Sequence, residues 1–238
     1  MGKKTDNNFK VYVNKNGERV MRVSDIIKIL AKEQLILWAN NLGFKGISYR
    51  KELERTANIG SLCHDVIEKY FNKRYLAEID YDESDISQYG DKVEVRRALD
   101  SFFDWYKRFR KQHTYNIKFT EKVVIGESFG GTIDCGIDGW EDPSKVIFVD
   151  YKTSGDFYLT QFLQLAAYVI IYEELYGPDT VEGIMVVRLD KKGGKAVARF
   201  IHRKNLNPFI ICFQCMFDVA TGIQILNTNL KNLSEKID

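Results

Sequence analysis

The stretch GGTIDCGIDGWEDPSKVIFVDYK, residues 130–152, decides the fold of this chain. It contains two runs rich in β-branched and apolar residues, Thr132–Ile137 and Val146–Tyr151. Turn-forming residues at 139–144 separate the two runs, which is typical of two consecutive strands joined by a short loop. A sheet that contains both strands is therefore expected.

Similar patterns extend to both sides of these strands. Further strands are expected at 9–13, 19–23, 118–126, 181–189 and 196–202, and helices at 24–38, 49–71, 91–113, 158–176 and 205–230. Acidic and turn-forming residues at 78–90 indicate a surface loop. The order of the elements predicts one α/β domain with a central mixed sheet flanked by helices. Its N-terminal region, residues 1–115, holds short strands and helices, and its α/β core covers residues 116–238.

The composition and the net charge exclude several classes of protein. The chain has 238 residues, with 35 Lys and Arg against 33 Asp and Glu, so its formal net charge is +2. Its 45% hydrophobic and 29% charged residues exclude a disordered, collagen-like or coiled-coil chain. Uncharged apolar stretches fall short of the ~20 residues that span a membrane, and the first residues lack the apolar segment of a secretory signal. A cytoplasmic protein without a membrane partner is therefore expected.

Two aspartates stand where a buried strand would carry apolar residues, Asp134 in the first run and Asp150 in the second. Because alternate strand residues share a face, Asp150 and Lys152 project to the same side. Clusters of oxygen ligands suit Mg²⁺ or Mn²⁺. A lysine beside the metal can orient or deprotonate an attacking water when burial and nearby cations lower its pKa. A salt bridge between Asp150 and Lys152 is the alternative, and it is the better explanation of a D-x-K motif taken alone.

The helix expected at 49–71 carries a third candidate ligand. Gly60, His64 and Glu68 are spaced i, i+4 and i+8, so they form one stripe along the helix. Gly60 leaves room for another backbone or a ligand to approach. His64 can bind a metal through a ring nitrogen, and Glu68 can support His64 from outside the ligand set. Taken singly, His64 is better explained as a hydrogen-bonded structural histidine, and Glu68 as a solvated charge or as a partner of His64.

The helix expected at 158–176 carries three polar residues on one face, Gln161, Gln164 and Tyr168. The rest of this helix is largely apolar, so its two amides and its phenol need polar partners. A metal-bound water, Lys152 or a DNA phosphate could supply those partners. Ordinary amphipathicity, with the polar face in water, is the alternative.

Together these motifs resemble the PD-(D/E)XK nuclease superfamily: G-x3-H-x3-E on a helix, G-x-x-D in a strand, D-Y-K at the next strand end and Q-x3-Y on the following helix. The resemblance covers roughly residues 55–175 and is greatest to the RecB-like exonuclease branch, including phage-encoded exonucleases and the mitochondrial genome maintenance exonuclease. It implies DNA as the substrate and one or two Mg²⁺ or Mn²⁺ ions as cofactors. Family roles carry over to His64, Asp134, Asp150 and the Tyr151 carbonyl as metal ligands, to Lys152 as the catalytic lysine, and to Gln164 and Tyr168 as accessory catalytic residues.

Cysteine usage departs from the iron–sulfur members of that branch, which hold a cluster with one upstream and three C-terminal cysteines. This chain has Cys63, Cys135, Cys212 and Cys215. The last two lack a third C-terminal partner, so no iron–sulfur cluster is expected. The C-x-x-C pair is better explained by two small apolar residues on a helix than by a zinc or redox site.

DNA binding needs local positive charge, because the net charge of the chain is small. Residues 105–111, WYKRFRK, interleave aromatic rings with basic side chains, a pattern that suits single-strand stacking and phosphate contact. The basic residues are Lys107, Arg108, Arg110 and Lys111. Basic residues in the last turn of a helix also complement its dipole, so both interpretations stay open. The basic hairpin at 191–195 is a second candidate or a solvated turn.

The leading hypothesis is a metal-dependent DNA exonuclease that acts on single strands or free ends in recombination, repair or replication, with other proteins of those processes as partners. A phage-encoded chain would act in the host cytoplasm. A structure-specific endonuclease of the same fold is the first alternative, with the 78–90 loop and the N-terminal helices forming an arch over the site. A non-catalytic nucleic-acid-binding module is the second, disfavoured because Asp134, Asp150 and Lys152 are all present. An α/β domain with incidental salt bridges is the third.

Overall fold

The computed structural model describes residues 10–30, 33–74 and 92–233. The expected loop at 78–90 and the start of the first expected strand lie outside these residues. The strands are β1 (Tyr12–Val13), β2 (Arg19–Arg22), β3 (Ile117–Ile125), β4 (Phe129–Asp138), β5 (Val146–Lys152), β6 (Val181–Arg188) and β7 (Val197–His202). The helices are α1 (Val23–Ile27), α2 (Glu33–Phe44), α3 (Tyr49–Arg74), α5 (Lys92–Gln112), α6 (Leu159–Tyr176), the short η1 (Arg203–Asn205) and α7 (Asn207–Leu233).

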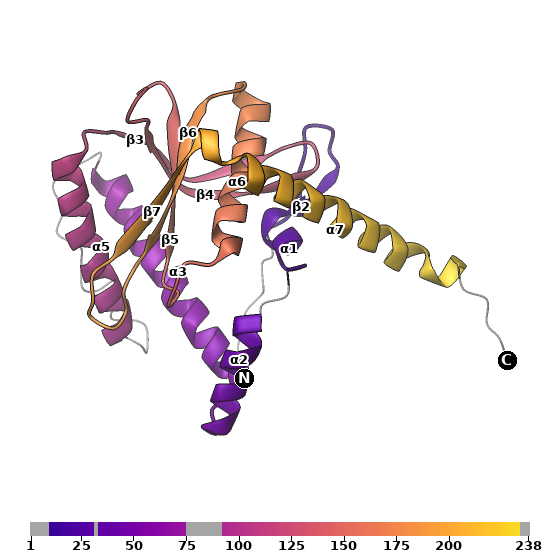
Figure 1. The fold of residues 1–238 in the computed structure, drawn as a ribbon, viewed down its shortest axis with the longest axis horizontal. Coiled ribbons are helices and arrows are strands. Elements are labelled where there is room, and N and C mark those ends of the chain that lie inside the picture. Colours follow the sequence, from indigo (N-terminus) through magenta and orange to yellow (C-terminus); the bar gives the residue numbers. More distant parts are fainter. Residues whose placement is uncertain (1–9, 31–32, 75–91, 234–238) are drawn as a thin grey trace.

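The described strands form one mixed sheet of seven strands (Figure 1). On one side, β4 pairs antiparallel with β3 along most of its length. On the other side it has two partners in succession, the parallel β2 at Phe129 and Gly130 and the antiparallel β5 from Cys135 onward. The sheet continues from β5 to the parallel β6 and the antiparallel β7. The expected mixed sheet flanked by helices is confirmed.

Two apolar cores lie on the two faces of the sheet. The first packs α3 and α5 against side chains such as Cys135, Val149 and Tyr151. The second packs α1, α6 and α7 against side chains such as Ile133 and Phe148. Figure 1 shows α3 and α5 together on one side and α6 and α7 on the other. Helices on both faces bury all of β5 except its last residue, which explains its continuous apolar run.

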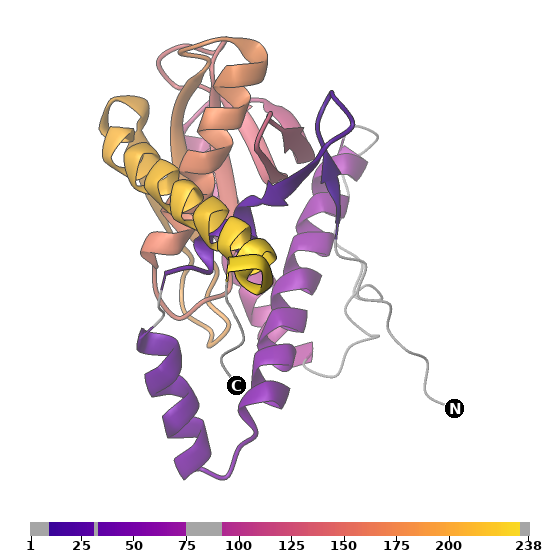
Figure 2. The ribbon, with the colours of Figure 1, turned by 90° about the vertical axis from the view of Figure 1, so that its right-hand side faces the viewer.

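The N-terminal helices differ from the expectation in two places. The single helix expected at 24–38 is two helices, and Arg22, not Ser24, precedes the first helical residue. Val23 is helical because its side chain is buried with Ile26 and Ile27, one turn further on the same face. Helix α3 is continuous through Gly60, like the helix expected at 49–71. Figure 2 shows α2 and the first half of α3 extending together beyond the sheet.

The two sequence regions contribute to a single sheet. The expected division between residues 115 and 116 lies between α5 and β3, while β1 and β2 from the N-terminal region join β4. Tyr12 reinforces this connection, since its hydroxyl lies 3.0 Å from the hydroxyl of Thr132.

Helix α7 corrects the expectation that no segment has the length and composition of a membrane span. Within its residues 207–230, the most apolar stretch of 18 residues has a mean hydropathy of 1.8, and 17% of that stretch is buried inside the molecule. The sequence-based expectation considered uncharged runs, and Asp218 divides this one. Length and composition alone are weak evidence for a membrane span.

Candidate active site

The candidate site lies where β4 changes its partner on one side. Between Gly130, paired with β2, and Cys135, paired with β5, side-chain alternation along β4 is interrupted: Ile133 and Cys135 belong to opposite cores. On the neighbouring β3, Glu121 has a positive φ of 45°, which is uncommon for a residue other than glycine. Such irregularities redirect side chains next to functional sites. Here ligand atoms of Glu121, Asp134 and His64 come within 4.8 Å of one another.

Helix α3 brings His64 to the edge of the sheet. Its Nε2 donates a hydrogen bond to the carbonyl oxygen of Tyr151 at 2.7 Å, and its Nδ1 lies 3.3 Å from Oδ2 of Asp134. That same carboxylate oxygen accepts a hydrogen bond from the backbone N–H of Tyr151 at 3.0 Å. The structure thus brings three predicted ligands together. In a neutral imidazole with its proton on Nε2, both Nδ1 and Oδ2 present lone pairs, so a proton or a metal ion is required between them.

Asp150 is the most deeply buried member of the site, with 1% of its surface exposed. Its Oδ1 accepts a hydrogen bond from Nζ of Lys152 at 2.6 Å, whereas Oδ2 is buried without a partner among the described residues. Burial raises the pKa of Asp150 to about 6, the charge of Asp134 adds to the rise, and Lys152 opposes it. Ionised Asp150 therefore lacks part of the compensation that a buried carboxylate requires.

Without a bound metal, Lys152 is held as an ammonium ion. Burial lowers the pKa of Lys152, but the charges of Asp150 and Asp134 outweigh that effect, so its pKa is raised overall. The expected decrease requires nearby cations such as bound metal ions, and the charged protein groups that raise the pKa of this lysine are carboxylates. The geometry favours Lys152 as a hydrogen-bond donor that orients water over Lys152 as a base.

Glu121 is a member of the cluster that the sequence did not single out. Burial raises its pKa to about 7, and the charge of Asp134 contributes. Its only signal in the sequence is a carboxylate inside an otherwise β-type run. Glu68, expected to support His64, accepts a hydrogen bond from Nδ2 of Asn72 at 3.4 Å. The negative charge of Glu68 also contributes to the raised pKa of Glu121, so its electrostatic influence extends to that residue.

Helix α6 provides the other wall of the site. Nε2 of Gln164 donates a hydrogen bond to the Tyr168 hydroxyl at 3.0 Å, and burial raises the pKa of Tyr168, with contributions from Asp134 and Asp150. Its phenol ring packs so closely on Gly131 that a Cβ there would lie 2.4 Å from the ring. Gln161 has a different place. Its side chain accepts the N–H of Tyr158 at 3.0 Å, donates to Ser154 at 2.9 Å, and so caps the start of α6.

Comparison with known proteins bears on this arrangement. The sequence model of the PD-(D/E)XK nuclease superfamily matches residues 39–209, more than half of the chain. The chain belongs to the PD-(D/E)XK nuclease superfamily. This confirms the suspected superfamily and makes the chain a metal-dependent nuclease, while the RecB-like branch stays a prediction. The His64, Glu121 and Asp134 cluster is consistent with a divalent metal.

The other comparisons add little to this assignment. No curated protein matches the chain. The solved structure described as "Crystal structure of SSO0001" is similar over 87% of this chain and 79% of its own, at 12% identity and a TM-score of 0.39. We rest no conclusion on a likeness of that size.

The stretch expected to bind DNA lies away from the nuclease site. Its aromatic rings, Trp105, Tyr106 and Phe109, are buried in the core and are not available to stack on bases. Phe109 and His113 contact Trp140 in the β4–β5 loop, at the end of β5 opposite Lys152. Arg108 pairs with Asp104, and Arg110 binds the Tyr115 carbonyl. The stacking interpretation is therefore wrong, and Lys107 and Lys111 remain as exposed cations.

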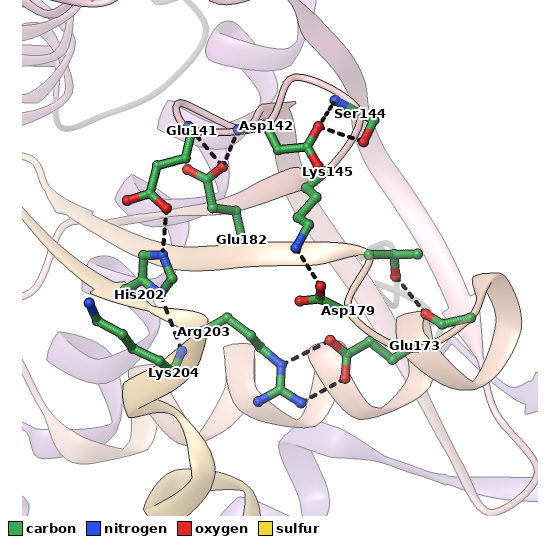
Figure 3. Close-up of polar contacts among 12 residues, drawn as sticks. Glu141, Asp142, Ser144, Lys145, Glu173, Asp179, Glu182, His202, Arg203 and Lys204 are labelled. Atoms are coloured by element: carbon green, nitrogen blue, oxygen red, sulfur yellow. Dashed lines mark hydrogen bonds and ion pairs between the residues drawn. The ribbon is translucent and has the colours of Figure 1, made fainter.

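A second buried carboxylate stabilises the loop between β4 and β5. Glu182 is 4% exposed and accepts hydrogen bonds from the backbone N–H groups of Trp140, Glu141 and Asp142 at 2.7–3.0 Å. Figure 3 shows the contacts from Glu141 and Asp142. Glu182 thereby holds the β4–β5 loop, which joins the strands that carry Asp134 and Asp150.

Proposed function

We propose that this nuclease is a metal-dependent DNA exonuclease acting on single strands or free ends. One observation carries the proposal: the buried Oδ2 of Asp150, without a partner among the described residues, beside Lys152 and close to Asp134. A buried carboxylate oxygen of this kind requires a cation or a hydrogen-bond donor, and a divalent metal can supply the missing charge.

The donor set fits a hard divalent cation. Carboxylate oxygens of Asp134 and Asp150, the Tyr151 carbonyl and a ring nitrogen of His64 would hold Mg²⁺ or Mn²⁺, with Glu121 as a further oxygen donor. The facing lone pairs of His64 Nδ1 and Asp134 Oδ2 are consistent with this assignment. When bound, one or two such ions supply Lewis-acid activation of water and charge neutralisation at phosphorus.

The neighbouring side chains orient the reactants. The Lys152 ammonium donates hydrogen bonds to the attacking water and to a non-bridging oxygen of the scissile phosphate, where negative charge develops in the transition state. The Tyr168 phenol stays protonated because burial raises its pKa, so it can donate a hydrogen bond to the strand. Gln164 fixes the phenol through their 3.0 Å hydrogen bond. These contacts favour in-line attack by positioning.

A gel assay tests the proposal directly. Linear end-labelled and closed circular single-stranded DNA are incubated with Mg²⁺, Mn²⁺ or EDTA, and matched RNA is run in parallel. We expect metal-dependent loss of the linear DNA only, with the position of the label giving the polarity. Lys152→Ala should abolish cleavage. Lys145→Ala is the matched control, because Lys145 has a similar exposure, 26% against 24%, and pairs with Asp179 at the other end of β5.

Other outcomes would replace the proposal with a specific alternative. Cleavage of the circle would indicate an endonuclease, because an exonuclease requires an end. Binding of DNA without cleavage by the wild type would indicate a non-catalytic module. The biological setting is part of the same proposal: end processing in recombination, repair or replication, with proteins of those processes as partners, in the cytoplasm of the cell or of a phage host.

A further inference from the structure

Two arginines extend the catalytic face of the sheet beyond Lys152. In the parallel pairing of β5 and β6, Lys152 lies opposite Arg188 and Asp150 opposite Val186. In the antiparallel pairing of β6 and β7, Val186 lies opposite Arg199. Paired residues of neighbouring strands share a face, so both arginines project to the side of the sheet that carries Asp150 and Lys152.

Phe157 brings the two arginines together in a defined arrangement. It lies in the loop that follows Lys152, and Cζ of Arg199 is 4.4 Å from the centroid of its ring. Cζ of Arg188 is 6.0 Å from the same centroid, and its Nη1 donates a hydrogen bond to the Gly155 carbonyl at 3.0 Å. We call Phe157, Arg188 and Arg199 the Phe157–arginine cluster.

The charge of this cluster is compensated only in part, by the electrostatic interaction of Arg188 with Asp190. Within the described part of the chain, neither arginine forms an ion pair with a carboxylate. The nearby carboxylates accept hydrogen bonds from backbone N–H groups. Asp156 accepts the N–H of Phe157 at 2.7 Å, and Asp190 accepts those of Lys192 and Gly194 at 2.8 and 2.9 Å. Arg199 is exposed, so its guanidinium edge and outer face are open to solvent.

We propose that the Phe157–arginine cluster binds the nucleic-acid strand next to the scissile phosphate. The guanidinium plane of Arg199, held on the Phe157 ring, presents its outer face to a base, and the N–H groups of both arginines reach the phosphates. Arginine suits this role because it combines a planar surface with several donors, and stacking of this kind tolerates any base. The inference rests on the proposed nuclease function and names where its substrate lies.

Binding and cleavage of a short fluorescent oligothymidylate test the proposal. Affinity is measured in EDTA by anisotropy over a range of salt concentrations, and kcat and KM are measured in Mg²⁺. The double variant Arg188→Gln/Arg199→Gln should bind at least roughly tenfold more weakly. Its log–log salt slope should be smaller by about 1.4, because two phosphate contacts to a single strand are lost. KM should rise, and kcat should change by less than about twofold, since uniform binding is removed.

A matched double variant tests the competing surface. Lys107→Gln/Lys111→Gln removes the same charge from α5, at the opposite end of β5, and should leave affinity and salt slope unchanged. A third variant separates stacking from charge. Arg199→Lys should keep the wild-type salt slope yet weaken oligothymidylate binding several-fold, and this loss should vanish on an abasic strand. Melting temperatures of all variants confirm that they fold.

Three results would overturn the proposal. Wild-type affinity and KM in the folded arginine double variant would place the strand elsewhere, and weakened binding by the α5 variant alone would place it on that helix. An Arg199→Lys loss that persists on the abasic strand would remove the stacking role. These readouts differ from failure of the nuclease proposal, in which the wild type binds the strand in EDTA but leaves it intact in Mg²⁺.

Discussion

Two buried carboxylates of this nuclease differ in how their charge is compensated. Glu182 and Asp150 are 4% and 1% exposed. Both oxygens of Glu182 accept backbone N–H groups of the β4–β5 loop. Asp150 has Lys152 on one oxygen and no partner on the other among the described residues. Glu182 is compensated by the chain itself, whereas Asp150 is incomplete without an external cation.

This contrast separates structural from functional burial. A carboxylate whose oxygens accept backbone hydrogen bonds needs no further partner. Its removal leaves several backbone donors without partners. A carboxylate crowded by others destabilises the folded chain until a ligand arrives, and binding of that ligand recovers the stability. Substitution at the two positions should therefore have opposite consequences for activity and for folding.

The largest effect is expected from Asp150→Asn. Loss of a charged metal ligand should reduce metal-dependent cleavage on the order of 10³-fold or more, because the metal supplies several kcal/mol to the transition state. The metal-free protein should unfold at a temperature close to that of the wild type, since a poorly compensated buried charge has been removed. Single-turnover cleavage and melting in EDTA measure the two quantities. Normal cleavage in Mg²⁺ by this variant would refute the site.

Glu182→Gln should show the reverse pattern. The amide keeps one acceptor oxygen but places an NH₂ group against backbone donors, so we expect a loss of about 2–4 kcal/mol in the free energy of unfolding. Cleavage per folded molecule should stay within about twofold of the wild type, because Glu182 touches the β4–β5 loop and no site residue. Urea unfolding and activity corrected for the folded fraction provide the measurement. A large loss of kcat in fully folded Glu182→Gln would contradict the assignment of a structural role to Glu182.

The pH dependence of stability sharpens the comparison further. The pKa of Asp150 is about 6 in the folded chain against an ordinary 3.8, so the folded state binds more protons than the unfolded state between these values. Its contribution to stability is therefore present below about pH 4 and is lost as the pH rises through 6. Relative to Asp150→Asn, the free energy of unfolding of the wild type in EDTA should fall by about 3 kcal/mol across this window.

Metal provides the control for that pH effect. A divalent ion competes with protons for the same ligands, so Mg²⁺ or Mn²⁺ should raise the melting temperature of the wild type more at neutral pH than at pH 4. Asp150→Asn should lose most of this increase. A difference between the two proteins that does not change with pH in EDTA would show that Asp150 titrates at its ordinary pKa.

The parts of the site that follow from local sequence could be predicted, and those that depend on strand register could not. Strand alternation places Asp150 and Lys152 on one face, and helical spacing brings His64 to the sheet edge. Glu121 could not be predicted as a site residue, because its position depends on the β3–β4 register and on a positive φ. Of the two interpretations of residues 105–111, base stacking fails because the rings are buried. Phe102, Tyr106 and Phe109 recur at helical spacing, which is typical of a core-facing stripe.

The smallest effect is expected from two glycine substitutions, one in the β4–β5 loop beside Glu182 and one in α3 near the candidate site. A Cβ on Gly139 would lie 2.3 Å from the carbonyl oxygen of Asp142 and 2.4 Å from Glu182, whereas a Cβ on Gly60 would meet only Thr153 Oγ1, at 3.5 Å. Gly139→Ala should therefore destabilise the chain by about 1–3 kcal/mol through overpacking. Gly60→Ala should stabilise it by about 0.5–1 kcal/mol, because glycine inside a helix is conformationally costly.

The cleavage activity of Gly60→Ala shows whether the space beside Gly60 has a function. If it is only the contact between α3 and the end of β5, Gly60→Ala should cleave DNA at the wild-type rate, with urea unfolding reporting the gain in stability. If the strand or a metal ligand approaches the backbone of α3 there, the same variant should fold normally and yet show a raised KM. That second result would extend the binding surface from Lys152 onto α3, because Gly60 lies one turn before His64 on the same stripe.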